Sequence, residues 1–253
     1  MRSTLDAPEI ARRSRGRARR IVLAVAAAVA LALAAIPSQS LAQTTTIQPG
    51  ASIINEGGGQ CTLNWVYDGT GAHAGTVFVG TAAHCVDRVG ERITLQTGTF
   101  GSPILVIGEV AFISSNLDYS LIRVFEENLS LVDPAMKGHP NIPTGVSTTQ
   151  TAGVGDLVQF SGNGVGFHAT TLTQEERVGV LHFNDGTEWS ALGPVSFGDS
   201  GGPVGDITDG NKALGIVTVL CVGIPCSGAG GVSLEGLLLN AASFGFTVTV
   251  RTV

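Results

Sequence analysis

The sequence predicts a mostly β protein built from two halves of similar length. Glycine accounts for 35 of the 253 residues, charged residues for 13% and apolar residues for 43%. This composition excludes a disordered chain and a coiled coil, and it provides enough apolar residues for a sizeable core. Short apolar or alternating runs recur along the chain, and no run before residue 230 keeps a helical period over three turns. Antiparallel strands joined by tight turns are therefore expected.

Seven runs have the length and pattern of β-strands. They lie at residues 63–67, 76–81, 104–112, 120–125, 157–161, 213–220 and 246–250. Asp-Gly pairs that begin at Asp68, Asp185 and Asp209 favour hairpin turns, because glycine adopts the left-handed backbone that such turns require.

One helix and one connector complete the expected organisation. The helix is predicted over residues 233–243, where four apolar side chains share a face: Leu234, Leu237, Leu238 and Ala241. Residues 129–145 contain three prolines and little periodicity, which predicts a connector. It would separate an N-terminal half, 43–128, from a C-terminal half, 146–253.

Residues 1–42 have the pattern of a secretory signal peptide. Six arginines between residues 12 and 20 precede sixteen apolar residues, Ile21 to Ile36, and the small-residue exit Ser40-Leu41-Ala42 follows. Cleavage before Gln43 would release a secreted, extracellular protein. The alternative is a membrane anchor, but the apolar run is short for a span and half of it is alanine. No stable anchor is expected.

The mature chain would be strongly acidic. Removal of residues 1–42 takes away seven basic and two acidic residues, which leaves 7 basic against 18 acidic residues and a net charge of −11. A protein that binds the phosphate backbone needs a positive surface. No nucleic-acid partner is therefore expected.

Four cysteines lie in the mature part: Cys61, Cys85, Cys221 and Cys226. An even number in an exported protein predicts two disulfides, for which three pairings are possible. The alternative is a zinc site that combines Cys61 and Cys85 with His73 and His84, but the spacing matches no common zinc motif. No metal site is expected.

A glycine-rich turn, Gly198-Asp199-Ser200-Gly201-Gly202-Pro203, contains a candidate nucleophile, Ser200. Backbone N–H groups in such a turn can form an oxyanion hole. The same pattern fits the α/β-hydrolase elbow, whose histidine follows the serine, but no histidine follows His182. Candidate partners lie upstream instead, His84 in Thr-Ala-Ala-His-Cys and Asp118 in Asp-Tyr-Ser-Leu-Ile, which gives the order His, Asp, Ser.

These three blocks resemble the active-site blocks of the chymotrypsin-type (trypsin-like) serine peptidases. The short spacings and the C-terminal end are similar to the secreted bacterial streptogrisin branch, and the resemblance extends over most of residues 50–253. It implies an all-β fold of two six-stranded antiparallel β-barrels, with the active site in the cleft between them and a short C-terminal helix. His84 and Asp118 would belong to the first barrel and Ser200 to the second.

The resemblance implies a serine endopeptidase that hydrolyses protein or peptide substrates through an acyl-enzyme. Ser200 would attack the scissile carbonyl, His84 would accept and return the proton, and Asp118 would fix the histidine tautomer. The backbone N–H groups of Gly198 and Ser200 would bind the oxyanion. The reaction needs no cofactor, and a monomer is expected.

The resemblance also indicates a specificity pocket. Six residues would form its floor and walls: Pro194, Val195, Thr218, Val219, Leu220 and Gly231. None of them supplies a carboxylate to offset the desolvation of lysine or arginine, so cleavage after uncharged apolar residues is predicted. Leu220 stands where the family often has glycine and would shorten the pocket.

Departures from the streptogrisin pattern carry further expectations. Ser196 replaces a cysteine of a branch disulfide, so the resemblance favours the pairs Cys61–Cys85 and Cys221–Cys226. The branch often has an arginine that neutralises the aspartate before the nucleophile, and Phe160 occupies that position here. The partner of Asp199 is therefore open, and a trypsin-like free N-terminus at Ile53-Ile54 is one candidate.

Two other functions remain open. The first is a trypsin-fold binding protein with little turnover, in which Asp199 lacks compensation and the oxyanion turn is collapsed. The second is an esterase that uses the same triad on non-peptide acyl groups. A fluorophosphonate that labels Ser200 would separate the first from a peptidase, and a comparison of peptide with ester substrates would separate the second.

Overall fold

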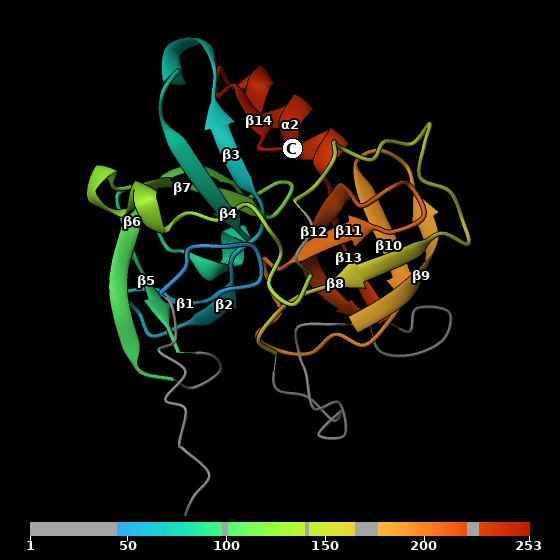
Figure 1. Cartoon of the computed structure of the whole chain (residues 1–253), viewed down its shortest axis with the longest axis horizontal. Helices are drawn as coiled ribbons and strands as arrows, with labels where there is room; N and C mark the ends of the chain where they lie inside the picture. Colours follow the sequence, from blue (N-terminus) through green and yellow to red (C-terminus); the bar gives the residue numbers. More distant parts are fainter. Residues whose placement is uncertain (1–44, 98–100, 140–141, 165–176, 222–227) are drawn as a thin grey trace, which may run out of the picture. The chain divides into compact units, whose positions relative to one another are not determined.

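Two antiparallel β-sheet units account for most of the chain in the computed structural model (Figure 1). The structure describes residues 45–97, 101–139, 142–164, 177–221 and 228–253, and both sheet units belong to one compact unit, Thr45–Val253. The predicted signal peptide, 1–42, lies outside the described residues. Within the described part, no helix has the length and apolar character needed to cross a membrane.

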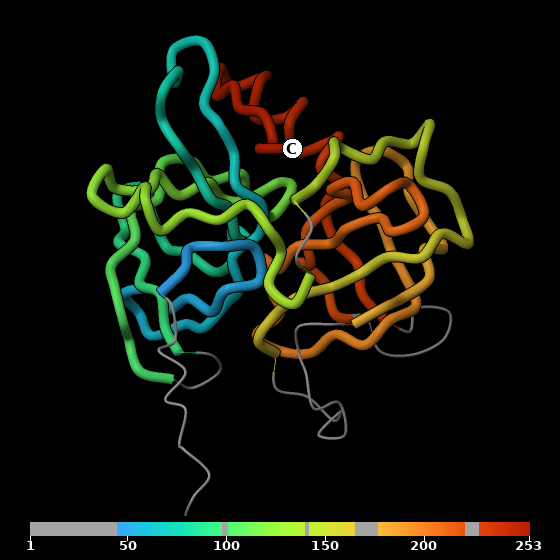
Figure 2. Tube along the Cα trace, viewed as in Figure 1, coloured from blue at the N-terminus to red at the C-terminus, as the bar shows by residue number. Residues whose placement is uncertain are grey.

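The N-terminal unit is an eight-stranded antiparallel sheet with the strand order β14-β3-β4-β7-β6-β5-β1-β2. Its strands are β1 (Ser52–Ile54), β2 (Gln60–Thr62), β3 (Val66–Gly69), β4 (Val77–Thr81), β5 (Arg92–Gln96), β6 (Pro103–Ser114), β7 (Tyr119–Val124) and β14 (Val248–Val250). The last strand comes from the other end of the chain and pairs with β3. The C-terminus therefore returns to the N-terminal unit (Figure 2).

The C-terminal unit is a closed barrel with the strand order β10-β13-β12-β11-β8-β9. Its strands are β8 (Leu157–Phe160), β9 (Arg177–Asn184), β10 (Glu188–Leu192), β11 (Pro203–Asp206), β12 (Lys212–Cys221) and β13 (Gly228–Ser233). Helix α2 (Leu234–Ser243) follows directly. The Ser233 hydroxyl accepts the backbone N–H of Gly236 and so caps the first turn of the helix.

The predicted fold class is confirmed, since the chain is mostly β with two antiparallel units and one short C-terminal helix. The N-terminal unit differs in detail from the expected six-stranded barrel, because it has eight strands and includes β14. The connector region begins within a short 3-10 helix, η3 (Glu126–Leu131). Val132 then bridges to Ile47 and Val146 bridges to Ala213, so the segment passes from one unit to the other.

Three clusters of buried side chains form the core. One fills the N-terminal sheet, around Leu63, Val79, Ile93, Ile107 and Ile122. One fills the C-terminal barrel, around Val158, Phe160, Leu181, Trp189 and Leu214. The third lies between the two units and combines Trp65, Tyr67, Phe78, Tyr119, Ile216, Leu234 and Leu237. Because its members come from both units, this apolar cluster packs the two units against each other.

The predicted disulfide between Cys61 and Cys85 is present, with a Cα–Cα distance of 6.1 Å. It joins the middle of β2 to a short 3-10 helix, η2 (Ala83–Cys85). The second predicted pair, Cys221–Cys226, lies outside the part of the chain whose side chains the structure describes.

Candidate active site

His84 and Asp118 meet because their strands are neighbours. Strands β4 and β7 pair with Thr81 opposite Ser120. His84 lies three residues beyond the end of β4, and Asp118 comes just before the start of β7. The pairing of the two strands therefore brings the loop that follows one beside the turn that precedes the other.

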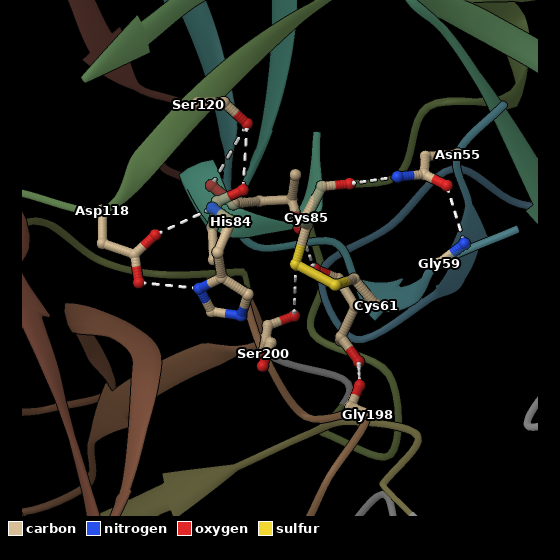
Figure 3. The surroundings of a disulfide bond; sticks show 12 residues. Asn55, Gly59, Cys61, His84, Cys85, Asp118, Ser120, Gly198 and Ser200 are labelled. Carbon is tan, nitrogen blue, oxygen red and sulfur yellow. Dashed lines mark hydrogen bonds and ion pairs between the residues drawn. A yellow bond between two sulfur atoms is a disulfide. The ribbon is translucent and has the colours of Figure 1, made fainter. Parts of the chain in front are cut away.

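Two hydrogen bonds join Asp118 to His84 (Figure 3). Asp118 Oδ1 accepts the backbone N–H of His84 at 2.9 Å, and Oδ2 lies 2.7 Å from Nδ1 of the ring. Because a carboxylate accepts here, Nδ1 carries the proton and Nε2 is left as a base. The bond from Asp118 raises the pKa of His84 above its ordinary value, and partial burial of the ring opposes this increase.

Asp118 has a left-handed backbone, with φ at 52°. This conformation costs a residue with a Cβ on the order of 1 kcal/mol. In this strained conformation both carboxylate oxygens face His84.

Ser200 comes from the C-terminal barrel and lies beside the imidazole of His84, on the side of the ring away from Asp118 (Figure 3). Its carbonyl oxygen accepts the backbone N–H of Thr62 at 2.9 Å. The next residue, Gly201, has φ at 83°, and a Cβ there would lie 2.2 Å from the Thr81 hydroxyl. The glycine after Ser200 therefore permits the close approach of the two units at this point.

Two backbone N–H groups of the nucleophile turn are free. Within the described part of the chain, neither Gly198 N–H nor Ser200 N–H has a hydrogen-bond acceptor. Gly198 has φ at 101°, a conformation that favours glycine. Both predicted oxyanion donors are thus available to a ligand.

Asp199 has a buried partner, Arg177 of β9. Arg177 Nη1 and Nη2 donate to the two carboxylate oxygens at 2.5 and 2.8 Å, and the side chains are 6% and 1% exposed. The backbone N–H groups of Gly164 and Ser196 also donate to Asp199, each at 2.8 Å. All these bonds hold the residue before Ser200 in one orientation.

Arg177 was not predicted from the sequence, although the position where an arginine was expected is its neighbour in the barrel. Phe160, the position where the resemblance places an arginine, pairs directly with Arg177 across the β8–β9 ladder. The other candidate, a free N-terminus at Ile53, is not supported. Ile53 is the middle residue of β1, is 1% exposed and pairs with both Cys61 and Leu95.

A cleft of about 480 Å³ contains His84 and Ser200 and receives residues from both units. Four of the six predicted pocket residues line it: Val195, Thr218, Val219 and Leu220. Gly231 does not, because it pairs with Val217 inside the barrel sheet, and Pro194 also lies outside the lining.

Three residues that were not predicted also line the cleft: Asn55, Gln60 and Phe197. Phe197 is 77% exposed, and such exposure of an aromatic ring could have marked it only once the fold was known.

The zinc alternative does not fit the observed chemistry. Potential ligand atoms of Cys61, His84 and Cys85 lie within 4.8 Å of one another. Cys61 and Cys85 form a disulfide with each other, so neither sulfur is a thiolate that could bind a metal. His73 lies elsewhere and stacks against Phe246, with 4.1 Å between the ring centroids.

Comparison with known proteins identifies solved structures that have a similar fold. No protein-family model and no curated protein matches the sequence. Thermobifida fusca Protease A is similar, with a TM-score of 0.55 and 20% identity over 81% of this chain and 100% of that one. Nocardiopsis protease (NAPase) has a TM-score of 0.54 and 18% identity, and the Cellulomonas bogoriensis chymotrypsin 0.52 and 17%; each comparison covers 82% of this chain and all of the other. The chain therefore has the fold of the bacterial chymotrypsin-like serine proteases.

Proposed function

We propose that the protein is a secreted serine endopeptidase whose catalytic triad is Ser200, His84 and Asp118. The observation that carries the proposal is the hydrogen-bonded His84–Asp118 pair with Ser200 on the other side of the ring (Figure 3). A serine hydroxyl is a weak nucleophile near neutral pH and needs a base to take its proton. His84, with Nδ1 bonded to a carboxylate, has the tautomer required for that task.

The same geometry supports each later step. As Ser200 attacks, negative charge develops on the carbonyl oxygen, and the free N–H groups of Gly198 and Ser200 would stabilise it. His84 then returns the proton to the leaving amine, which leaves an acyl-enzyme for water to hydrolyse. Asp118 stays ionised and stabilises the imidazolium.

The cleft favours uncharged apolar residues before the scissile bond. Among its described lining residues there is no carboxylate, so a lysine or arginine side chain would be desolvated without compensation. Val195, Val219 and Leu220 supply an apolar surface, and Phe197 adds an exposed aromatic ring to the lining.

Secretion is supported by the Cys61–Cys85 disulfide, because such bonds persist in oxidising compartments.

The binding-protein alternative rested mainly on an Asp199 carboxylate without a counter-ion. Arg177 supplies that counter-ion, which argues against this alternative. The esterase alternative uses the same residues and is separated from the proposal only by the choice of substrate.

A fluorophosphonate probe and the Ser200→Ala variant test the proposal. We expect the probe to label Ser200 in the wild type, and the substitution to abolish labelling and lower kcat by about 10⁴ or more. Ser190→Ala is a matched control, since that hydroxyl lies on β10 and contacts His182 outside the cleft. Peptidase activity in Ser200→Ala above a tenth of the wild-type value would contradict the assignment. Turnover of esters without turnover of peptides would favour the esterase.

A further inference from the structure

Thr62 bonds to both residues that carry the proposed oxyanion donors. It is the last residue of β2, next to Cys61, and is fully buried. Its backbone N–H donates to Ser200 O at 2.9 Å, and its hydroxyl donates to Gly198 O at 2.7 Å. A single residue of the N-terminal unit therefore fixes two carbonyl groups of the nucleophile turn in the C-terminal unit.

The direction of the Thr62 hydroxyl is set by its other neighbours. Asn163 donates its backbone N–H to Thr62 Oγ1 at 3.3 Å, and the Asn163 side-chain amide lies 3.4 Å from the same oxygen. A hydroxyl has one proton, and because Asn163 donates, that proton is directed at Gly198 O. Asn163 is itself anchored to Gly50 O at 2.8 Å.

Gly198 is the part of the turn that most needs such an anchor. A glycine has no Cβ to restrict its dihedral angles, and the preceding residue, Phe197, is 77% exposed. Within the described chain, the Thr62 hydroxyl makes the one hydrogen bond on Gly198. The same peptide group is also held through the Asp199 N–H, which donates to Ser196 O at 3.1 Å. If the Thr62 bond were lost, this longer bond alone would hold the group, and Gly198 could rotate its N–H away from the oxyanion site.

We propose that Thr62 is a positioning residue for the oxyanion hole. Its hydroxyl holds the Gly198 carbonyl so that the Gly198 N–H stays directed into the cleft. Thr62 is not among the residues that line the cleft, so it acts through Gly198 and not on the substrate. The inference rests on the proposed peptidase function and adds a specific role for a residue outside the triad.

The substitution Thr62→Val tests the role of the hydroxyl, because valine keeps the shape of threonine without the donor. We expect kcat to fall roughly tenfold to a hundredfold, less than the 10²–10³ that follows the removal of an oxyanion donor itself. KM should change by less than about twofold, since the interaction matters most in the transition state. Affinity for a peptide boronic acid, which mimics that state, should fall in proportion to kcat/KM. Thr62→Ser, which restores the hydroxyl, should recover most of the activity.

Ser147→Ala is the control for loss of a buried hydroxyl. Ser147 is 1% exposed and bonds to Asp206 and Asp209, away from the cleft. It should lower stability in a urea titration and leave kcat unchanged. If Thr62→Val keeps kcat within about twofold of the wild type, or if Thr62→Ser is as impaired as Thr62→Val, the positioning role is wrong.

Hydrogen exchange separates this inference from the proposed function. Backbone amides of residues 196–200 should exchange faster in Thr62→Val than in the wild type or in Ser147→Ala, whether or not the protein turns over peptides. A wild type that neither reacts with the fluorophosphonate nor cleaves peptides would overturn the peptidase proposal. Unchanged exchange in residues 196–200 would overturn the role of Thr62.

Discussion

Arg177 donates from both terminal nitrogens to the carboxylate of Asp199, and the pair is almost completely shielded from solvent. The two residues lie on different parts of the same barrel, at the start of β9 and in the turn that precedes β11. A bidentate arginine–carboxylate pair is strongly directional. The pair therefore fixes the backbone immediately before Ser200 from inside the protein.

Replacement of Arg177 by methionine should destabilise the protein strongly. The variant leaves the Asp199 charge buried without a partner, which costs about 3–5 kcal/mol in comparable sites. A urea titration would measure the loss, and fluorophosphonate labelling would report the accompanying loss of the active turn. Arg251→Met is the control, because its pair with Asp68 is 30% and 44% exposed and should contribute less than about 1 kcal/mol. Equal losses in the two variants would contradict a structural role of the buried pair.

Activity should not depend on a free N-terminus near β1. Ile53 is paired on both sides within the sheet, and Asp199 already has its counter-ion. A protein that begins at Thr45 and the same protein with an acetylated or extended N-terminus should have equal kcat/KM values. A rise in activity only after cleavage between Ser52 and Ile53 would show trypsin-like activation instead.

The pH profile should reflect the environment of His84. The ring must be neutral to accept the proton of Ser200, so kcat/KM rises as pH passes upward through the pKa of His84. Asp118 raises that pKa above the ordinary 6.5, which moves the midpoint to a higher pH than an isolated histidine would give. In Asp118→Asn the midpoint should move down, together with a large fall in kcat.

Rates measured with a chromogenic peptide between about pH 5 and pH 9 would define the midpoint. Glu109→Gln is a suitable control, since this carboxylate pairs with Arg123 on the exposed side of the sheet. A midpoint that stays the same in Asp118→Asn, or an optimum near pH 4 in the wild type, would contradict the role of His84 as the base.

The size of the specificity pocket should depend on Leu220. Leu220→Ala removes apolar volume from the cleft wall, so the ratio of kcat/KM for peptides with phenylalanine to those with alanine should rise at least about tenfold. Leu192→Ala is a matched control on β10, where the leucine is 50% exposed and outside the cleft. Matched peptides that differ only before the scissile bond would measure the ratio. Faster cleavage after arginine or lysine than after every apolar residue would contradict an uncharged pocket.

Local patterns in the sequence predicted much of the fold. Strands with clear alternation, such as β4, β6 and β7, lie within a few residues of their predicted positions. Strands β1 and β2 were missed because three residues are too few to show a period. Strand β13 was missed because its glycines interrupt the apolar pattern, and in the structure they allow close contact with neighbouring strands.

The residues of the candidate site also fall into two groups, those marked by a local motif and those placed by contacts between distant segments. His84, Asp118 and Ser200 each stand in a short motif that can be recognised without a structure. The position of Arg177 depends on how β8 and β9 pair, and Thr62 depends on how the two units approach each other. Neither relationship leaves a local pattern, so only the three-dimensional arrangement identifies these residues.

The left-handed backbone of Asp118 and its carboxylate place different requirements on the residue at this position. Glycine adopts this conformation without strain and asparagine with less strain than most residues, yet neither supplies the carboxylate that His84 bonds to. Replacement by glycine would relieve strain on the order of 1 kcal/mol, but it would also remove the acceptor of the His84 backbone N–H and add freedom to the unfolded chain, which together cost about as much. Selection for heat resistance alone should therefore be nearly indifferent between aspartate and glycine at position 118, and selection for peptide hydrolysis should keep the aspartate.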